Sequence, residues 1–485
     1  MHIERSAMQT LDSGHMSELR TDVAIIGAGT AGLAAYRAVK AAGRSALLVE
    51  GGPYGTTCAR VGCMPSKLLI APAEAAHAVD RLRGFGLELE GRVKVDGEAV
   101  MARVRAERDR FVGFVTRGVD EIPDGDKVRG RARFVDNRTL IVDERMTVHA
   151  RSIVIATGSS PAYPAAWKVL GDRLITNDDV FELARLPDSV AVFGPGVIGL
   201  ELGQALHRLG CSVKVFGRGG GVGPLSDPDV LREAREIFGA EFYLDTDARA
   251  EVAREGDKVV VRDRALDGSS RIERFDYLLA ATGRTANVSG LALERTTLAI
   301  DQHGVPLFDR KTLRCGDSSI FIAGDVNNDV PLLHEAADEG RIAGENAARF
   351  PDVSSRRRRA LLSVVFSDPQ IAIVGGGWAR LRDTPHVTGA VSFVNQGRAR
   401  VMLRNQGLLH VYAETDTGVF LGAEMLGPEA EHIGHLLAWA LQMKLTVAQM
   451  LEMPFYHPVI EEGLRTALRD AQAKRELAAQ TQRAA

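Results

Sequence analysis

The feature that most constrains the fold of this chain is a glycine-rich turn that occurs twice with the same pattern around it. The first copy is Gly-Ala-Gly-Thr-Ala-Gly at residues 27–32, directly after an apolar run at residues 21–26. A helical stretch follows to about residue 42, and a second apolar run at residues 45–49 ends in an acid. This order of strand, turn, helix, strand and acid is typical of a Rossmann-type unit that binds a dinucleotide.

Each residue of the first copy has a physical task. Gly27 makes the turn, Gly29 lets a pyrophosphate approach backbone N–H groups, and Gly32 lets the helix pack on the strand. Glu50 is the acid that would accept hydrogen bonds from the ribose hydroxyls of an adenosine. The spacing from turn to acid fits this unit, so a chance glycine-rich turn is the weaker explanation.

The second copy begins after the apolar run at residues 190–193 and contains Gly194, Gly196 and Gly199. A helix to residue 209 and a strand at residues 212–216 complete it, so the chain is predicted to hold two nucleotides. Its acid position is occupied by Gly217, and Arg218 follows. An Arg can hold the 2′-phosphate of NADP, whereas NAD is usually held by an acid. A solvated Arg218 explains the sequence equally well, so the sequence leaves NAD or NADP open.

Three further strands end in turns that we expect to face the cofactors. Residues 151–156 end in Thr157-Gly158, and residues 277–281 end in Thr282-Gly283-Arg284. Residues 319–323 precede Gly324-Asp325, whose carboxylate could meet a ribityl or pyrophosphate oxygen.

Two cysteines, Cys58 and Cys63, follow the first nucleotide unit within Gly-Thr-Thr-Cys-Ala-Arg-Val-Gly-Cys-Met-Pro-Ser-Lys at residues 55–67. The alternatives to a redox pair are two structural thiols or half of a metal site. A structural zinc needs four ligands, and the other two cysteines, Cys211 and Cys315, lie far away in the sequence. We therefore predict a redox-active pair and no metal.

The spacing of the pair also restricts its local structure. Five residues of regular helix advance about 7.5 Å, beyond the Cα separation of about 4.4–6.8 Å in a disulfide. The pair can close only across a distorted helix start, which Gly62 and Pro65 would permit. A thiol at a helix N-terminus also has a lowered pKa, because the helix dipole favours the thiolate.

Composition excludes several classes of protein. The length of 485 residues suggests about three domains. A net charge of −3 argues against nucleic acid or an anionic membrane as partner. No apolar run approaches the roughly 18–20 residues of a membrane span. Four cysteines in so long a chain argue against a secreted, disulfide-stapled protein, so we expect a cytoplasmic one. Residues 1–20 are polar, and Met16 could be an internal start.

Near the end of the chain stands Tyr-His-Pro-Val-Ile-Glu-Glu at residues 456–462. A single His before Pro is most often part of a surface turn. Pro458 suits the first turn of a helix, which would leave His457 at the cap and an acid one turn inside. An acid near an imidazole fixes its tautomer and raises its basicity.

With these motifs the chain resembles the FAD-containing pyridine nucleotide–disulfide oxidoreductases, the family of dihydrolipoamide dehydrogenase, glutathione reductase and mercuric reductase. The resemblance covers residues 21–470, in the order of the family's motifs. It implies an α/β fold with two Rossmann-like nucleotide-binding domains, for FAD and NAD(P), and a C-terminal α+β dimerisation domain. The segments expected are a polar extension at 1–20, the FAD domain at 21–160 and 287–355, the NAD(P) domain at 161–286, and the dimerisation domain at 356–485.

The resemblance also implies roles for the site residues. Cys63 would be the flavin-facing thiol, Cys58 the thiol that exchanges with substrate, and Lys67 with Glu201 an ion pair beside the flavin. His457 with Glu462 would be the acid–base pair delivered by the other subunit of a homodimer. The expected FAD contacts are Gly27, Gly29, Gly32, Glu50, Lys67, Thr157, Gly158, Gly324 and Asp325, and the expected NAD(P) contacts are Gly194, Gly196, Gly199, Arg218, Gly283 and Arg284.

Within the family the sequence is most like dihydrolipoamide dehydrogenase. Val197 stands at the nicotinamide gate, where glutathione reductases usually have Tyr, and no cysteine follows Cys315. Thr56, Arg60, Gly217-Arg218 and Val459 depart from the family pattern and suggest a divergent member. The substrate would be a lipoyl-bearing protein or a small dithiol or disulfide. The alternatives are an NADPH-dependent reductase of a small disulfide, like glutathione reductase, and a catalytically silent flavin-bearing binding subunit.

Overall fold

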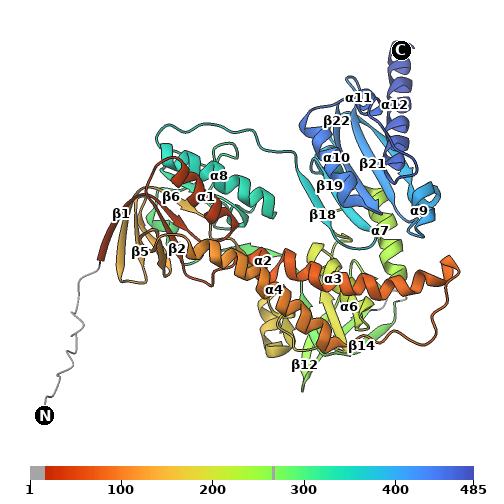
Figure 1. Ribbon diagram of the computed structural model, residues 1–485, viewed down its shortest axis with the longest axis horizontal. Coiled ribbons are helices and arrows are strands. Elements are labelled where there is room, and N and C mark those ends of the chain that lie inside the picture. The colour runs from red at the N-terminus through yellow and green to blue at the C-terminus, as the bar shows by residue number, and fades with distance from the viewer. Residues whose placement is uncertain (1–16, 265–267, 485) are drawn as a thin grey trace. The chain divides into compact units, whose positions relative to one another are not determined.

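The computed structural model describes residues 17–264 and 268–484 (Figure 1). The chain forms two compact units, each made of several separate segments. Unit 1 contains the residues up to Thr56, Gly113–Ser160 and Thr285–Arg357. Unit 2 contains Thr57–Val112, Pro161–Arg284 and Arg358–Ala485. The domain boundaries expected from the sequence, with segments at residues 21–160, 161–286, 287–355 and 356–485, stay a prediction.

Unit 1 is built on a sheet with strand order β3-β2-β1-β6-β5-β4, to which β17 is added beside β6. The strands β1, β2, β3, β6 and β17 run parallel, and β4 and β5 join β6 as an antiparallel hairpin. Their bounds are Ser17–Ile26 for β1, Ala46–Glu50 for β2, Lys127–Arg129 for β3, Ala132–Asp136 for β4, Thr139–Val142 for β5, Met146–Ile155 for β6 and Ile320–Ile322 for β17.

Both faces of this sheet are buried, because alternate residues of β1 belong to different apolar cores. Val23 and Ile25 join the core under the helices α1 (Thr30–Ala41) and α8 (Leu333–Arg349). Ala24 and Ile26 join the core on the opposite face. This period of two is the pattern of a strand covered on both sides.

Unit 2 contains a second parallel sheet, with strand order β11-β10-β9-β15-β8. The helices α6 (Val197–Arg208) and α7 (Pro228–Glu241) and an antiparallel sheet of β12, β13 and β14 accompany it. The strand bounds are Leu174–Ile175 for β8, Ser189–Phe193 for β9, Ser212–Phe216 for β10, Tyr243–Asp245 for β11, Glu251–Glu255 for β12, Lys258–Arg264 for β13, Ser270–Phe275 for β14 and Tyr277–Ala280 for β15.

The cysteines lie on two consecutive helices of unit 2, α2 (Thr57–Val61) and α3 (Cys63–Ala78). The helix α3 packs against α6, and Leu69 and Ile70 of α3 share an apolar core with Leu200 of α6. The helix that begins at Cys63 and the helix that follows the second glycine-rich turn are therefore held together by one core.

The C-terminal part of unit 2 is an antiparallel sheet with strand order β18-β19-β22-β21-β20. The helix α10 (Ala430–Gln442) packs on β18, β19 and β22, and α12 (Glu461–Ala484) packs on β20 and β21. The strand bounds are Leu362–Val365 for β18, Gln370–Val374 for β19, His386–Ser392 for β20, Leu408–Glu414 for β21 and Phe420–Gly427 for β22.

The remaining elements are short or connect these layers. They are the helices α4 (Gly97–Asp120), α5 (Asn177–Val180), α9 (Gly397–Val401) and α11 (Val447–Leu451), the strands β7 (Ser159–Pro161) and β16 (Arg284–Ala286), and the 3-10 helices η1 (Val79–Phe85), η2 (Asp124–Asp126), η3 (Ala165–Arg173), η4 (Leu293–Arg295), η5 (Asp325–Asn327), η6 (Trp378–Arg380) and η7 (Phe393–Asn395).

The predicted α/β architecture with two nucleotide-binding units and a C-terminal α+β part is confirmed. Two local expectations were wrong. The first strand begins at Ser17, four residues before the predicted start. The last helix begins at Glu461, so His457 lies in the turn before that helix and not at its cap. Residues 1–16 of the predicted extension lie outside the described residues.

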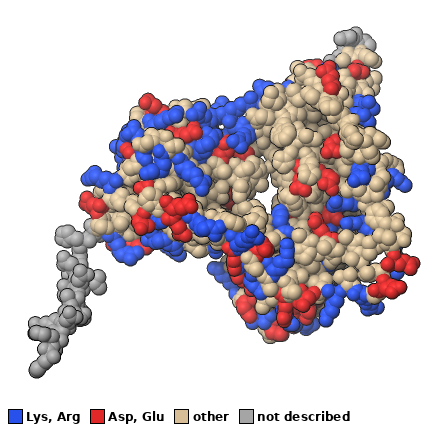
Figure 2. All heavy atoms as spheres, viewed as in Figure 1, with Lys and Arg blue, Asp and Glu red and all other residues tan. Residues whose placement is uncertain are grey.

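The surface carries both signs of charge. Figure 2 shows Lys and Arg interspersed with Asp and Glu on the visible face, in keeping with the net charge of −3. Among residues 17–264 and 268–484, no helix has both the length and the apolar character that a membrane crossing requires.

Candidate active site

The first glycine-rich turn joins β1 to α1 in unit 1 and has the geometry expected of a dinucleotide site. Gly27 has a φ of +108°, and a Cβ there would lie 2.3 Å from the carbonyl oxygen of Ala156. A Cβ on Gly32 would lie 1.8 Å from the carbonyl oxygen of Gly27. A Cβ on Gly29 would meet nothing within 4 Å. The turn is thus closed on the protein side and open at Gly29, the start of α1, where a pyrophosphate would bind.

Glu50 closes this turn from the end of β2. One carboxylate oxygen accepts a hydrogen bond from the Ala28 N–H at 2.7 Å, and the other accepts one from the Gly52 N–H at 2.6 Å. Two backbone donors hold the carboxylate at the turn, at the position where a ribose would meet it.

The other predicted FAD contacts of unit 1 also lie in tight turns. Asn287 pins the turn at Thr157 and Gly158, because its side-chain amide donates to the Thr157 carbonyl at 3.0 Å. Gly158 and Gly324 have φ angles of +69° and +79°. The Ser159 hydroxyl donates to the Asp325 carboxylate at 3.0 Å, so the structure brings these two turns together.

The second glycine-rich turn, between β9 and α6 in unit 2, repeats the geometry of the first. Gly194 has a φ of +106°, and a Cβ on Gly199 would lie 1.8 Å from the Gly194 carbonyl oxygen. A Cβ on Gly196 would meet nothing within 4 Å. Val197, the predicted gate residue, is the first residue of α6 and is 37% exposed. Gly283 has a φ of +120°, and the Arg284 guanidinium lies 3.5 Å from the Asn177 side-chain oxygen.

The break between α2 and α3 places the two cysteines next to each other. Gly62 has φ −126° and ψ −119°, which is outside the helical region. A Cβ there would lie 3.0 Å from the Thr57 carbonyl oxygen, so only glycine lets α2 fold this closely onto α3. Cys58 lies in α2, and Cys63 is the first residue of α3. Both are free thiols, and the Cys58 thiol donates a hydrogen bond to the Cys63 sulfur.

The two thiols ionise differently. The hydrogen bond from Cys58 lowers the pKa of Cys63 to about 7, with help from the charge of Lys67 and against the effect of burial. The same hydrogen bond, together with burial, raises the pKa of Cys58. Cys63 is therefore the thiolate of the reduced pair, and Cys58 keeps its proton near neutral pH.

Lys67 and Glu201 form an ion pair between α3 and α6. The Lys67 ammonium lies 2.9 and 2.7 Å from the two Glu201 carboxylate oxygens. The Glu201 side chain is only 5% exposed, so this pair is partly removed from water. Lys67 lies one helical turn after Cys63, which brings its charge to the thiol.

His457 and Glu462 pair with each other at the start of α12. The imidazole Nδ1 lies 3.0 Å from the nearer Glu462 oxygen, and the hydrogen bond to His457 lowers the pKa of Glu462. The His457 side chain is 81% exposed. Among the described residues its hydrogen bonds and ion pairs go to Glu462 alone, and none joins it to Cys58 or Cys63.

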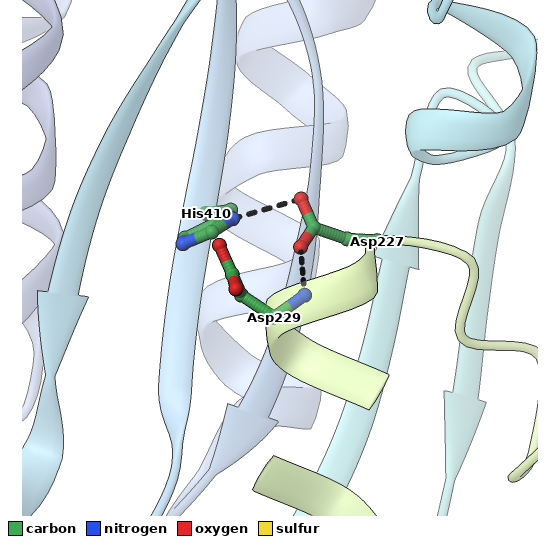
Figure 3. Close-up of side chains that lie close together, drawn as sticks. All are labelled: Asp227, Asp229 and His410. Carbon is green, nitrogen blue, oxygen red and sulfur yellow. Dashed lines mark hydrogen bonds and ion pairs between the residues drawn. The ribbon is translucent and has the colours of Figure 1, made fainter. Parts of the chain in front are cut away.

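Asp227, Asp229 and His410 form a separate cluster whose ligand-type atoms lie within 4.8 Å of one another (Figure 3). The Asp227 carboxylate accepts hydrogen bonds from the backbone N–H groups of Asp229 and Val230 at the start of α7. Its other oxygen lies 2.8 Å from His410 Nδ1 and 2.8 Å from the Tyr412 hydroxyl. These four contacts occupy the carboxylate, and the cluster attaches α7 to β21.

Comparison with known proteins decides the family. A family model described as pyridine nucleotide-disulphide oxidoreductase matches residues 21–340, and the dimerisation domain of the same family matches residues 361–468. The chain belongs to the pyridine nucleotide-disulphide oxidoreductases. The family, the class of enzyme and the use of FAD and NAD(P) predicted from the sequence are confirmed.

Individual relatives span nearly the whole of this oxidoreductase. The dihydrolipoyl dehydrogenase of Haloferax volcanii is 30% identical, over 93% of this chain and 96% of the relative. The mercuric reductase of Streptomyces lividans is 32% identical, over 92% of this chain and 95% of the relative. The crystal structure of LpdA from Mycobacterium tuberculosis has a TM-score of 0.78 and 26% identity, over 93% of this chain and 99% of that chain.

The residues of this oxidoreductase fit its two cofactors. The open positions at Gly29 and Gly196, each at the start of a helix, are where the two pyrophosphates would bind. Sequence reasoning missed two residues beside the thiols. The Asn177 amide donates to the Val61 carbonyl at 2.8 Å, and the Phe366 ring lies 4.4 Å from the Lys67 ammonium. Neither stands in a motif, so only the folded chain reveals them.

Proposed function

We propose that this protein is a dihydrolipoyl dehydrogenase-like enzyme, which passes electrons between a dihydrolipoyl-type dithiol and NAD(P) through the Cys58–Cys63 pair. The observation that carries the proposal is the pair itself, with one stabilised thiolate at the start of α3 and the Lys67–Glu201 ion pair beside it. Relatives named dihydrolipoyl dehydrogenase, about 30% identical over more than nine-tenths of this chain, support this class of substrate.

The chain's own residues account for the thiol chemistry. With the pair oxidised, one substrate thiolate attacks the Cys58 sulfur, and the Cys58–Cys63 bond breaks to release Cys63 as a thiolate. The second substrate thiolate attacks the substrate sulfur of the mixed disulfide and expels the Cys58 thiolate, which takes a proton from the His457 imidazolium, so the substrate becomes a disulfide. His457 accepts the proton of a substrate thiol, and Glu462 holds its ring. The open turn at Gly29 and Glu50 would hold FAD, which when bound would supply the acceptor for the electron pair of the reduced cysteines and the means of its transfer to a nicotinamide.

We further propose that the enzyme is a homodimer, in which His457 of one subunit serves the cysteines of the other. Its exposed apolar side chains support this. Three exposed apolar side chains follow one face of α10 and the residue after it: Leu436 (41% exposed), Trp439 (65%) and Met443 (71%). Tyr456, next to His457 in the chain, is 80% exposed. A second copy that covers these side chains would bury a strip of apolar surface next to the imidazole.

A cytoplasmic location is part of the proposal, because the cysteines outside the redox pair are buried free thiols.

A second candidate is an NADPH-dependent reductase of a small disulfide, and the end of β10 favours it. A Cβ on Gly217 would lie 2.7 Å from the Pro195 ring and 2.9 Å from the Thr246 carbonyl oxygen, so the usual acid has no room there. Arg218 follows with an exposed side chain, and the described residues offer it no acidic partner. An unpaired guanidinium at this position suits a 2′-phosphate.

One set of assays separates these candidates. Purified enzyme is assayed with dihydrolipoamide and either NAD or NADP, and with lipoamide or glutathione disulfide and either NADH or NADPH. Faster turnover of the lipoyl substrates than of glutathione disulfide supports the dehydrogenase-like enzyme. Faster turnover of glutathione disulfide supports the second candidate. Arg218→Glu should shift preference toward NAD(H) if Arg218 binds the phosphate. A flavoprotein that neither nucleotide reduces would instead be a silent binding subunit.

A further inference from the structure

Phe366, directly after β18, contacts both members of the Lys67–Glu201 ion pair. Its backbone N–H donates a hydrogen bond to a Glu201 carboxylate oxygen at 3.0 Å. Its ring lies under the Lys67 ammonium, with 4.4 Å from the nitrogen to the ring centroid. One residue thus binds the anion through its backbone and the cation through the face of its ring.

The segment that carries Phe366 is fixed on both sides. Val365 before it is fully buried, and the hydroxyl of the buried Ser367 after it donates to the Pro369 carbonyl at 2.8 Å. The Asp368 backbone exchanges two hydrogen bonds of 2.8 Å with the side-chain amide of Gln204. Phe366 therefore has little freedom to leave the ion pair.

A single face of α6 holds this segment. Glu201, Gln204 and Arg208 are spaced by three and four residues, which places them on one side of the helix. Glu201 accepts the Phe366 N–H, Gln204 binds the Asp368 backbone, and Arg208 lies 3.1 Å from the Asp368 carboxylate. Because the side chain of Arg208 is only 5% exposed, this end of the face is anchored by a buried ion pair.

The ion pair in turn acts on the thiolate. The charge of Lys67 lowers the pKa of Cys63 and that of Glu201 raises it, so the net effect depends on where the ammonium lies. Three titratable groups act on the pKa of Cys63: Cys58 on α2, Lys67 on α3 and Glu201 on α6. Glu74, Arg208 and Asp368 lie further along the same small cavity as Glu201 and Phe366.

We propose that Phe366 is a positioning residue, which holds the Lys67 ammonium between its ring and Glu201 and so sets the charge beside the Cys63 thiolate. The inference rests on the proposed function only in that Cys63 is the reactive thiolate. It concerns the ionisation of this thiol and requires no particular dithiol substrate.

The test compares Phe366→Leu and Phe366→Met, which lose the aromatic ring, with Phe366→Tyr, which keeps it. All are made in the FAD-loaded Cys58→Ser protein, so that Cys63 is the one active-site thiol. The rate of Cys63 alkylation by iodoacetamide is measured against pH. A lost cation–π contact leaves Lys67 less fixed, so we expect Leu and Met to slow alkylation about two- to fivefold below the pKa of Cys63. The Tyr variant should keep the parent profile.

Two results would overturn the proposal. Leu and Met variants that keep the parent pH profile would show that the ring does not fix the ammonium. A Tyr variant that shifts as much as Leu would show that packing, and not the aromatic face, is what matters. No dithiol substrate is added, so this test works even with an enzyme that fails to oxidise dihydrolipoamide. Failure of the proposed function is therefore distinguished from failure of the role of Phe366.

Discussion

Thr56 adopts a backbone conformation that favours glycine. Its φ is +58°, in the left-handed region, directly before α2. A β-branched residue there is strained by about 1–2 kcal/mol. Thr56, which departs from the family pattern, is therefore held in this conformation at a cost in stability.

Replacing this residue by glycine should stabilise the protein. The relieved strain exceeds the added chain entropy of glycine in the unfolded state, about 0.5–1 kcal/mol, so we expect a net gain of up to about 1 kcal/mol for Thr56→Gly. Thermal unfolding measures it. Thr57→Gly is the matched control, because Thr57 lies in α2 and its replacement should destabilise. A lower melting temperature for Thr56→Gly would contradict the assignment of strain.

Two roles are open to Arg60 between the two cysteines: lowering the pKa of the thiols, or attracting an anionic substrate. The cation that lowers the pKa of Cys63 is Lys67. The charge of Arg60 instead acts on Asp178, whose pKa burial raises above the ordinary value while Arg284 and, more weakly, Arg60 oppose that rise. We therefore expect Arg60 to affect the preference for a charged substrate and not the ionisation of the thiols.

A comparison of two substrates tests this role of Arg60. Dihydrolipoate carries a carboxylate and dihydrolipoamide does not, so Arg60→Asn should raise KM about two- to fivefold for the acid alone, as expected for a partly exposed charge. Arg60→Lys keeps the charge and serves as the control. Equal changes in KM for both substrates, or a shifted pH–rate profile, would count against a role in substrate attraction.

At the scale of elements, the start of α7 is attached to the C-terminal sheet by a buried carboxylate. Burial opposes ionisation of Asp227, but hydrogen bonds from His410 and Tyr412 and the charge of His410 keep its pKa below the usual value. A carboxyl with a lowered folded pKa adds stability that is fully present above its unfolded pKa of about 3.9. That stability is lost as the pH falls through the folded value.

We expect the free energy of unfolding of the wild type to fall in this acidic range, and Asp227→Asn to remove that part of the pH dependence. Because Asn still caps the helix but loses the charged contacts, the variant should be about 1–3 kcal/mol less stable at neutral pH. Denaturant unfolding at several pH values measures both effects. The exposed Asp229→Asn change is the control and should have little effect. Identical pH dependence in Asp227→Asn and the wild type would refute the attachment.

The sequence predicted the elements whose local signals are strong. Single residues that allow only certain backbone conformations determine both glycine-rich turns, their strands and the break at Gly62. The structure contains all of these features. It predicted the last helix to begin at Pro458, whereas α12 begins at Glu461, and its polar composition hides a buried side of Ala467, Leu468 and Ala471. The contact of Phe366 with the ion pair joins residues far apart in the chain, which no local pattern encodes.

At the scale of the whole molecule, we propose that the exposed His457 serves the cysteines of a second subunit, and mixed dimers test this. Cys58→Ser and His457→Gln homodimers should each be inactive toward dithiols. A heterodimer of the two retains one site with Cys58 from one chain and His457 from the other, so it should recover about half of the wild-type activity. Differently tagged chains, expressed together and purified through both tags, provide it. An inactive heterodimer with intact flavin would show that His457 acts within its own chain.

The central claim is that electrons between dithiol and nucleotide pass through Cys58 and Cys63. The most direct measurement compares wild-type and Cys58→Ser enzyme in two assays, reduction of the bound flavin by NAD(P)H and steady-state oxidation of dihydrolipoamide. We predict that the variant keeps flavin reduction, because the substitution leaves both glycine-rich turns unchanged, and that it loses dithiol turnover. A Cys58→Ser enzyme that oxidises dihydrolipoamide at the wild-type rate would contradict it.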